Sequence, residues 1–69
     1  MIDIGDKIKR TRLKLGLTQE ELAARTELSK GFISQLERNL TSPSIATLID
    51  ILEALGTDIA DFFTTGDAD

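Results

Sequence analysis

The stretch QEELAARTELSKGFISQLER, residues 19–38, decides the fold that this sequence predicts. Thr18 stands directly before it, and Glu21 follows three residues later, which is the spacing of a capping box at the start of a helix. Ser29 is placed to cap a second short helix, which is expected to end near Arg38. The stretch therefore predicts two consecutive helices joined by a short turn.

The two helices carry the residues that a small common core needs. Ala23 is small enough to let the helix backbones cross closely, and the turn between them falls at Glu27 and Leu28. The apolar positions that face the space between the helices are Leu22, Leu28, Ile33 and Leu36. At 100° per residue, Glu37 falls on the same inward side of the second helix.

The opposite face of this second helix is polar and has little bulk. Its members are Lys30, Gly31, Ser34, Gln35 and Arg38. A helix would prefer alanine to the glycine, whereas a helix that enters the major groove of DNA needs small residues and hydrogen-bond donors. A solvated surface helix would show the same residue types, so this face alone leaves both interpretations open.

Outside this stretch the sequence predicts three more helices and no strand. The first spans about residues 4–15, with Asp3 as its N-cap and Gly16 as its stop. Pro43 and its neighbouring serines place a loop at residues 39–44, and a helix with apolar positions follows to Leu55. A last short helix runs from the cap Asp58 to Phe63. The apolar positions of the 45–55 helix are Ile45, Leu48, Ile51, Leu52 and Leu55, and those of the first helix are Ile4, Ile8 and Leu15.

These elements predict an all-α, compact five-helix fold in one domain, residues 1–64, followed by a frayed acidic tail at 65–69. The chain has 69 residues, no cysteine and no histidine. The commonest general base, nucleophile and zinc ligands are therefore missing, and we expect no enzyme activity, no metal and no cofactor. No apolar run is long enough to cross a membrane, so a cytoplasmic location is expected.

Charge is divided unevenly along the chain, whose net charge is −4. Residues 1–38 hold eight basic and six acidic residues, a balance of +2, whereas residues 39–69 hold six acidic residues and no base, a balance of −6. This division favours a basic binding half and an acidic half. Ordinary surface charge with an acidic tail is the alternative.

Four motifs together resemble the helix-turn-helix proteins of the Cro and phage-repressor type, whose fold is lambda-repressor-like. They are GLTQEELA at residues 16–23, the spaced residues of ISQLER at 33–38, PS at 43–44, and an apolar fourth helix that ends in LG. SKGFISQLERN followed by TSPS further resembles bacterial regulators that carry a C-terminal cupin sensor. The chain is then either the N-terminal part of such a regulator or a naturally short one.

This resemblance implies a sequence-specific DNA-binding transcriptional regulator, expected to be a repressor that binds a two-fold operator in double-stranded DNA as a homodimer. It implies base reading by Lys30, Gly31, Ser34 and Gln35, with Gln35 as the strongest candidate. The implied DNA-phosphate contacts are Arg12, Thr18, Gln19, Arg38, Asn39, Thr41 and Ser42. It also implies a structural ion pair between Arg12 and Glu37. The alternative is a protein-interaction module of the antitoxin kind, with the same fold and little DNA binding.

Four features of the sequence depart from the family pattern or allow more than one interpretation. Glu27 occupies the turn position where relatives commonly have glycine, so either a non-glycine residue is left-handed there or the turn differs. The loop NLTSPS lacks the basic residue that relatives often carry there. Phe32 lies between the inward and outward faces and either packs in the core or contacts a thymine methyl group. Leu13, Leu40 and Phe63 are expected to form a dimer surface or to be ordinary exposed apolar residues.

Overall fold

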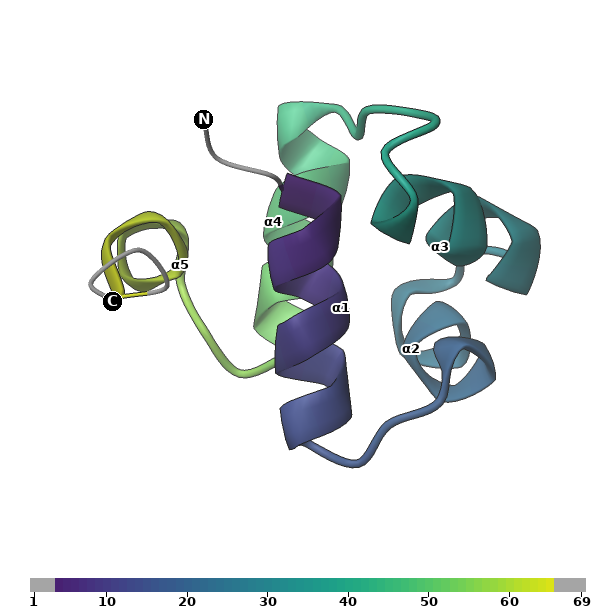
Figure 1. Cartoon of the computed structure of the whole chain (residues 1–69), viewed down its shortest axis with the longest axis horizontal. Helices are drawn as coiled ribbons and strands as arrows, with labels where there is room; N and C mark the ends of the chain where they lie inside the picture. The colour runs from purple at the N-terminus through teal and green to yellow at the C-terminus, as the bar shows by residue number, and fades with distance from the viewer. Residues whose placement is uncertain (1–3, 66–69) are drawn as a thin grey trace.

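The computed structural model describes residues 4–65, and residues 1–3 and 66–69 lie outside the description. The described residues form five α-helices and no strand (Figure 1). They are α1 (Ile4–Lys14), α2 (Gln19–Thr26), α3 (Lys30–Glu37), α4 (Ile45–Ala54) and α5 (Ile59–Thr65). The predicted all-α class and helix order are therefore confirmed. Asp3 and residues 66–69, expected as an N-cap and a tail, lie outside the described residues, whereas Thr65 belongs to α5.

The helices pack around α1 and α4. In Figure 1, α2 and α3 lie on one side of α1, α5 lies on the other side, and α4 lies behind it. The closest helix pairs are α2 with α3, α1 with α3, α2 with α4, and α4 with α5. Six side chains at the centre are almost inaccessible to water: Ile8, Leu22, Ile33, Leu36, Ile51 and Leu52.

The predicted core residues of the α2–α3 pair are buried, with Leu28 partly buried against them. Two apolar residues of the predicted helix faces are instead exposed. Leu15 is 52% exposed and follows the last residue of α1, and Ile45 is 66% exposed and is the first residue of α4. Both stand at helix ends, where no neighbouring helix covers them, so spacing alone placed them wrongly on a buried face.

Side chains cap four of the helices at their N-termini. Thr18 Oγ1 accepts from the Glu21 N–H at 3.0 Å, and Glu21 Oε1 accepts from the Thr18 N–H at 2.8 Å, so the predicted capping box is present. Ser29, Ser44 and Asp58 accept in the same way from the backbone N–H three residues later. These caps satisfy N–H groups that have no partner inside a helix.

Four helix ends use a residue in the left-handed region. Gly16 and Gly56, predicted as helix stops, have φ of 73° and 76°. Asn39 follows α3 with φ of 61°, and Leu40 N–H donates to the Gln35 carbonyl at 2.9 Å, which closes the helix in a Schellman motif. Glu27 ends α2 with φ of 60° and ψ of 29°. The turn is therefore the usual left-handed one, built with a non-glycine residue.

Gly5 lets α1 approach the last turn of α3. A Cβ atom at this position would lie 2.1 Å from the Leu36 carbonyl oxygen and 2.8 Å from Asn39 Oδ1. The Gly5 N–H donates to Asn39 Oδ1 at 3.2 Å, so a side chain beyond α3 satisfies a free amide in the first turn of α1. This contact was not predicted from the sequence, although a glycine inside a predicted helix was the available signal.

A buried ion pair joins the same two helices further along. Arg12 Nε lies 2.6 Å from Glu37 Oε2, and Arg12 Nη2 lies 2.9 Å from Glu37 Oε1. The Arg12 and Glu37 side chains are 7% and 1% exposed. Arg12 Nη1 also donates to the Leu17 carbonyl at 2.8 Å, at the residue before the N-cap of α2. The pair thus fixes α1, α3 and the start of α2 relative to one another.

None of the helices within residues 4–65 combines the length and the apolar character that a membrane span requires.

Glu27→Gly is expected to raise the free energy of unfolding by about 1 kcal/mol, because glycine removes the left-handed penalty of a residue with a Cβ atom. Thermal or urea unfolding measures the change. Glu27→Ala is the matched control: it removes the carboxylate but keeps Cβ, so it separates the charge effect from the backbone effect. Equal stability of the two variants would show that φ at residue 27 carries no penalty.

Arg12→Met and Glu37→Leu are each expected to lower the free energy of unfolding by about 3–5 kcal/mol, because each strands a buried charge. The double variant should lose less than the sum of the two, and a double-mutant cycle by urea unfolding gives the coupling energy. Single variants that are unfolded in buffer can be compared in a stabilising osmolyte. Additive losses would contradict an energetic link between the two residues.

Candidate nucleic-acid interface

The two faces of α3 differ in the way that the sequence predicted. Ile33, Leu36 and Glu37 are buried against the other helices, whereas Lys30, Gly31 and Gln35 are exposed and Ser34 is half-buried. The four predicted base-reading residues therefore share the outer face of one helix. Two turns of helix present an ammonium group, a hydroxyl and an amide here, which are donors and acceptors suited to base edges.

Gly31 is not required by the fold. A Cβ atom at this position would meet nothing closer than Ser29 Oγ at 4.0 Å, and the residue has ordinary helical backbone angles. Glycine inside a helix is less stable than alanine by about 0.5–1 kcal/mol. Gly5 is the opposite case, since packing against α3 leaves no room for a side chain there. Packing within the chain therefore does not explain the missing side chain at Gly31. Close contact of α3 with another molecule would explain it.

The N-terminus of α2, whose first residue contacts Glu37 of α3, presents free backbone amides. The capping box uses the N–H groups of Thr18 and Glu21, which leaves those of Gln19 and Glu20 for an outside acceptor. The Gln19 side chain is half-buried, and its Nε2 donates to Glu37 Oε1 at 3.0 Å. The Glu21 carboxylate, which would repel an anion, is held by the Thr18 N–H.

The other predicted phosphate contacts lie beyond the C-terminal end of α3. Arg38 and Ser42 are exposed, and Thr41 is half-buried. Asn39 is exposed but its Oδ1 accepts from Gly5, so its Nδ2 is the atom left for a ligand. Thr18 and Gln19 thus lie at the N-terminus of α2, and this second group lies beyond the C-terminus of α3. In the sequence, the residues of the outer face of α3 come between the two groups.

Arg12 is corrected as a candidate phosphate contact. Its guanidinium is buried and donates to both oxygens of Glu37 and to the Leu17 carbonyl. A phosphate would have to break these bonds to reach it. We therefore assign Arg12 to the ion pair alone.

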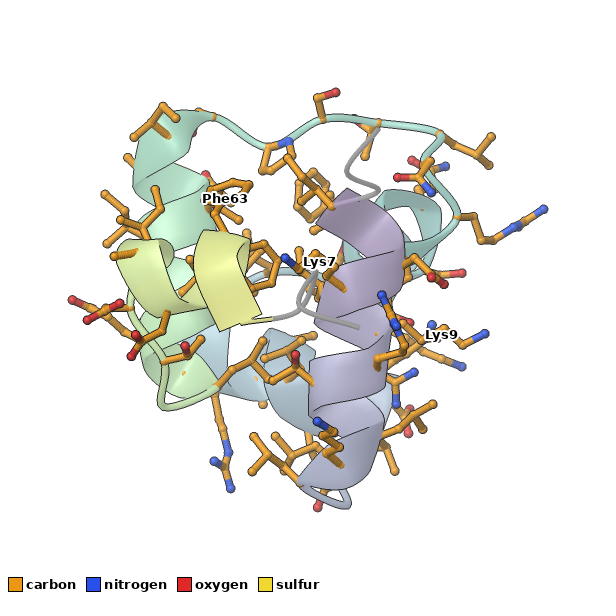
Figure 2. The ribbon with its side chains drawn as sticks, turned by 60° about the vertical axis from the view of Figure 1, so that its left-hand side comes forward. Lys7, Lys9 and Phe63 are labelled. Carbon is orange, nitrogen blue, oxygen red and sulfur yellow. The ribbon has the colours of Figure 1, made fainter. Side chains whose placement is uncertain are left out.

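Six of the eight basic residues are exposed, and two, Lys7 and Arg12, are buried. The exposed set is Lys9, Arg10, Lys14, Arg25, Lys30 and Arg38. Lys7 is 5% exposed, and its Nζ lies 5.1 Å and 5.8 Å from the ring centroids of Phe62 and Phe63. Figure 2 shows Lys7 on the side of α1 that faces Phe63, whereas Lys9 projects on the other side. This cation–π contact was not predicted from the sequence, and the buried Lys7 adds no accessible charge.

The four apolar residues whose role the sequence left open are also divided between partly buried and exposed positions. Phe32 and Phe63 are partly buried and pack against the core, and Phe63 also meets Phe62 edge to face at 5.2 Å. Leu13 and Leu40 are 56% and 64% exposed. Packing is therefore a role of both phenylalanines, whereas the two leucines are surface residues.

Comparison with known proteins agrees with this geometry. The helix-turn-helix family model matches residues 8–62. The chain is 38% identical over 64 residues to the uncharacterized HTH-type transcriptional regulator y4dJ of Sinorhizobium fredii, covering 93% of this chain and 83% of the relative. It is 35% identical over 57 residues to the immunity repressor of Bacillus phage phi105, covering 83% of this chain but only 40% of that protein.

Solved structures give the same result. The restriction-modification controller protein C.Esp1396I, solved as a tetramer in complex with its natural 35 base-pair operator, superposes with a TM-score of 0.84 and 35% identity. The match covers 91% of this chain and 83% of the controller protein. The chain therefore belongs to the helix-turn-helix family of the Cro and phage-repressor type, a family of DNA-binding transcriptional regulators.

Proposed function

We propose that this chain is a sequence-specific repressor whose residues 1–64 form a DNA-binding domain that inserts α3 into the major groove of a two-fold operator. The outer face of α3 is the observation that carries the proposal. It presents exposed hydrogen-bond donors beside Gly31, a glycine that packing within the chain does not require. The operator complex of C.Esp1396I and the similarity to the phage immunity repressor support it. Such a regulator acts by occupying DNA rather than by catalysis, and we propose a cytoplasmic location.

Base reading is assigned to the outer face of α3. Gln35 can donate to and accept from adenine through its amide, and Lys30 can donate to guanine. Ser34 offers a hydroxyl to either kind of base, and Gly31 lets the helix backbone come close. In this proposal these four residues determine which DNA sequence the protein prefers.

Phosphate contacts are assigned to the N-terminus of α2 and to the segment that follows α3. Gln19 and Thr18 would meet one phosphate at the N-terminus of α2, where free amides and the helix dipole favour an anion. Arg38, Asn39, Thr41 and Ser42 would meet another beyond α3. These contacts position the protein without specifying sequence.

A second copy of the chain would complete the site, because two-fold operators are read by two-fold dimers. Exposed apolar side chains on α4 and α5, at Ile45, Ile49 and Ile59, offer surface for that copy. The two recognition helices would then meet half-sites about 10 base pairs apart, or a multiple of that spacing.

Gly31→Ala is expected to separate stability from function. The free energy of unfolding should rise by about 0.5–1 kcal/mol, since alanine is the better helix residue and its Cβ meets open space. Affinity for the operator should fall, because the same methyl group keeps α3 away from the base edges. Thermal unfolding and fluorescence anisotropy on a labelled duplex measure the two effects. Undiminished affinity in the stabilised variant would place Gly31 outside the interface.

Gln35→Ala is expected to lower affinity for the preferred site by roughly 1–3 kcal/mol and to relax preference at one base pair in each half-site. Selection from a random duplex pool gives the preferred site, and binding to it and to a scrambled duplex gives the comparison.

Arg38→Ala is the control, because a phosphate contact serves both duplexes alike. It should weaken both equally and flatten the slope of log affinity against log salt by about one unit. If a folded Gln35→Ala variant keeps the full base preference, α3 is not the reader, and a protein partner becomes the better interpretation of its outer face.

A further inference from the structure

Gln19 is linked to the buried ion pair. It is the first residue of α2, and its Nε2 donates to Oε1 of Glu37 at 3.0 Å. The same carboxylate accepts two hydrogen bonds from Arg12. One buried group, 1% exposed, thus receives donors from α1 and α2 while it belongs to α3.

The acceptor fixes which way the Gln19 amide points. A carboxylate paired with an arginine can only accept hydrogen bonds, so the atom of Gln19 beside it has to be nitrogen. The reversed amide would place its oxygen against the carboxylate and lose the bond. Nε2 carries two hydrogens, and Glu37 takes one of them. The second hydrogen is therefore held in a defined direction at the N-terminus of α2.

We propose that Glu37 is a positioning residue for DNA binding, which acts by holding the Gln19 amide so that its second Nε2 hydrogen meets an operator phosphate. The inference rests on the proposed function, and it gives the buried pair a role beyond stability. A free glutamine side chain would have to be ordered when DNA binds, which lowers affinity by roughly two- to tenfold. Here folding has already ordered it.

The neutral amide gives this contact its own signature. Salt dependence reports the counterions released when Lys or Arg neutralises phosphates. Gln19→Ala should therefore weaken operator binding by roughly tenfold, near the lower end of the loss for one hydrogen bond to a charged group, without changing the salt slope. Arg38→Ala should lower that slope.

A matched pair of backgrounds tests the positioning role. R12M/E37Q and R12M/E37L both remove the ion pair and both free the Leu17 carbonyl, but only the first keeps an acceptor for Gln19 at position 37. Gln19→Ala is added to the wild type and to each background. Operator affinity is measured by anisotropy, at a temperature at which circular dichroism shows every variant folded. The expected loss is roughly tenfold in the wild type and in R12M/E37Q, and less than about twofold in R12M/E37L.

Equal losses in both backgrounds would overturn the inference while leaving the proposed function intact. A wild-type chain that selects no duplex from a random pool would overturn both. A second measurement needs no variant and serves if a background does not fold. Nuclear spin relaxation of the Gln19 side-chain amide in the wild type should give an order parameter near that of rigid backbone, about 0.85, and a value below about 0.6 would overturn the positioning role.

Discussion

The buried carboxylate of Glu37 is the point at which three helices are tied together. Arg12 reaches it from α1 and Gln19 reaches it from α2, while Arg12 also holds the chain just before α2 through the Leu17 carbonyl. Taking these charges out of water is costly, and apolar residues of similar size could fill the same space. Hydrogen bonds have direction, however, and apolar contacts do not. The pair therefore sets how α3 is rotated against α1 and α2.

That rotation decides what α3 shows to the outside. Because Glu37 points inward with Ile33 and Leu36, the residues on the opposite side, Gly31 and Gln35, point outward. The close approach of Gly5 to the Leu36 carbonyl holds the last turn of α3 from a second direction. A recognition helix needs this rigidity, since a reader that can rotate cannot match a fixed pattern of donors and acceptors on base edges.

Two residues of the helix-turn-helix unit are poor choices for stability alone. Glu27 adopts a left-handed conformation that glycine would adopt without strain, and Gly31 sits in a helix where alanine would fit. The proposed close approach to DNA gives Gly31 a reason. Nothing in the structure explains why residue 27 is glutamate.

The sequence by itself determined the class and order of the elements, because these depend on local chemistry. Caps at Thr18 and Ser29, stops at Gly16 and Gly56, and helical spacing of Ile33 and Leu36 act within a few residues of one another. The same spacing predicted the two faces of α3. The motifs then indicated the family, which the comparisons with known proteins confirmed.

Tertiary structure decided which residues of each type are available. Eight basic residues are equal in the sequence, yet Lys7 packs against aromatic rings and Arg12 is enclosed by Glu37, so neither is presented to a ligand. Leu15 and Ile45 fit their apolar patterns but lie at helix ends with no neighbour to cover them. The contacts of Gly5 with Asn39 and of Gln19 with Glu37 join residues far apart in the chain. Such pairings are set by how the helices pack, and local spacing carries no record of that packing.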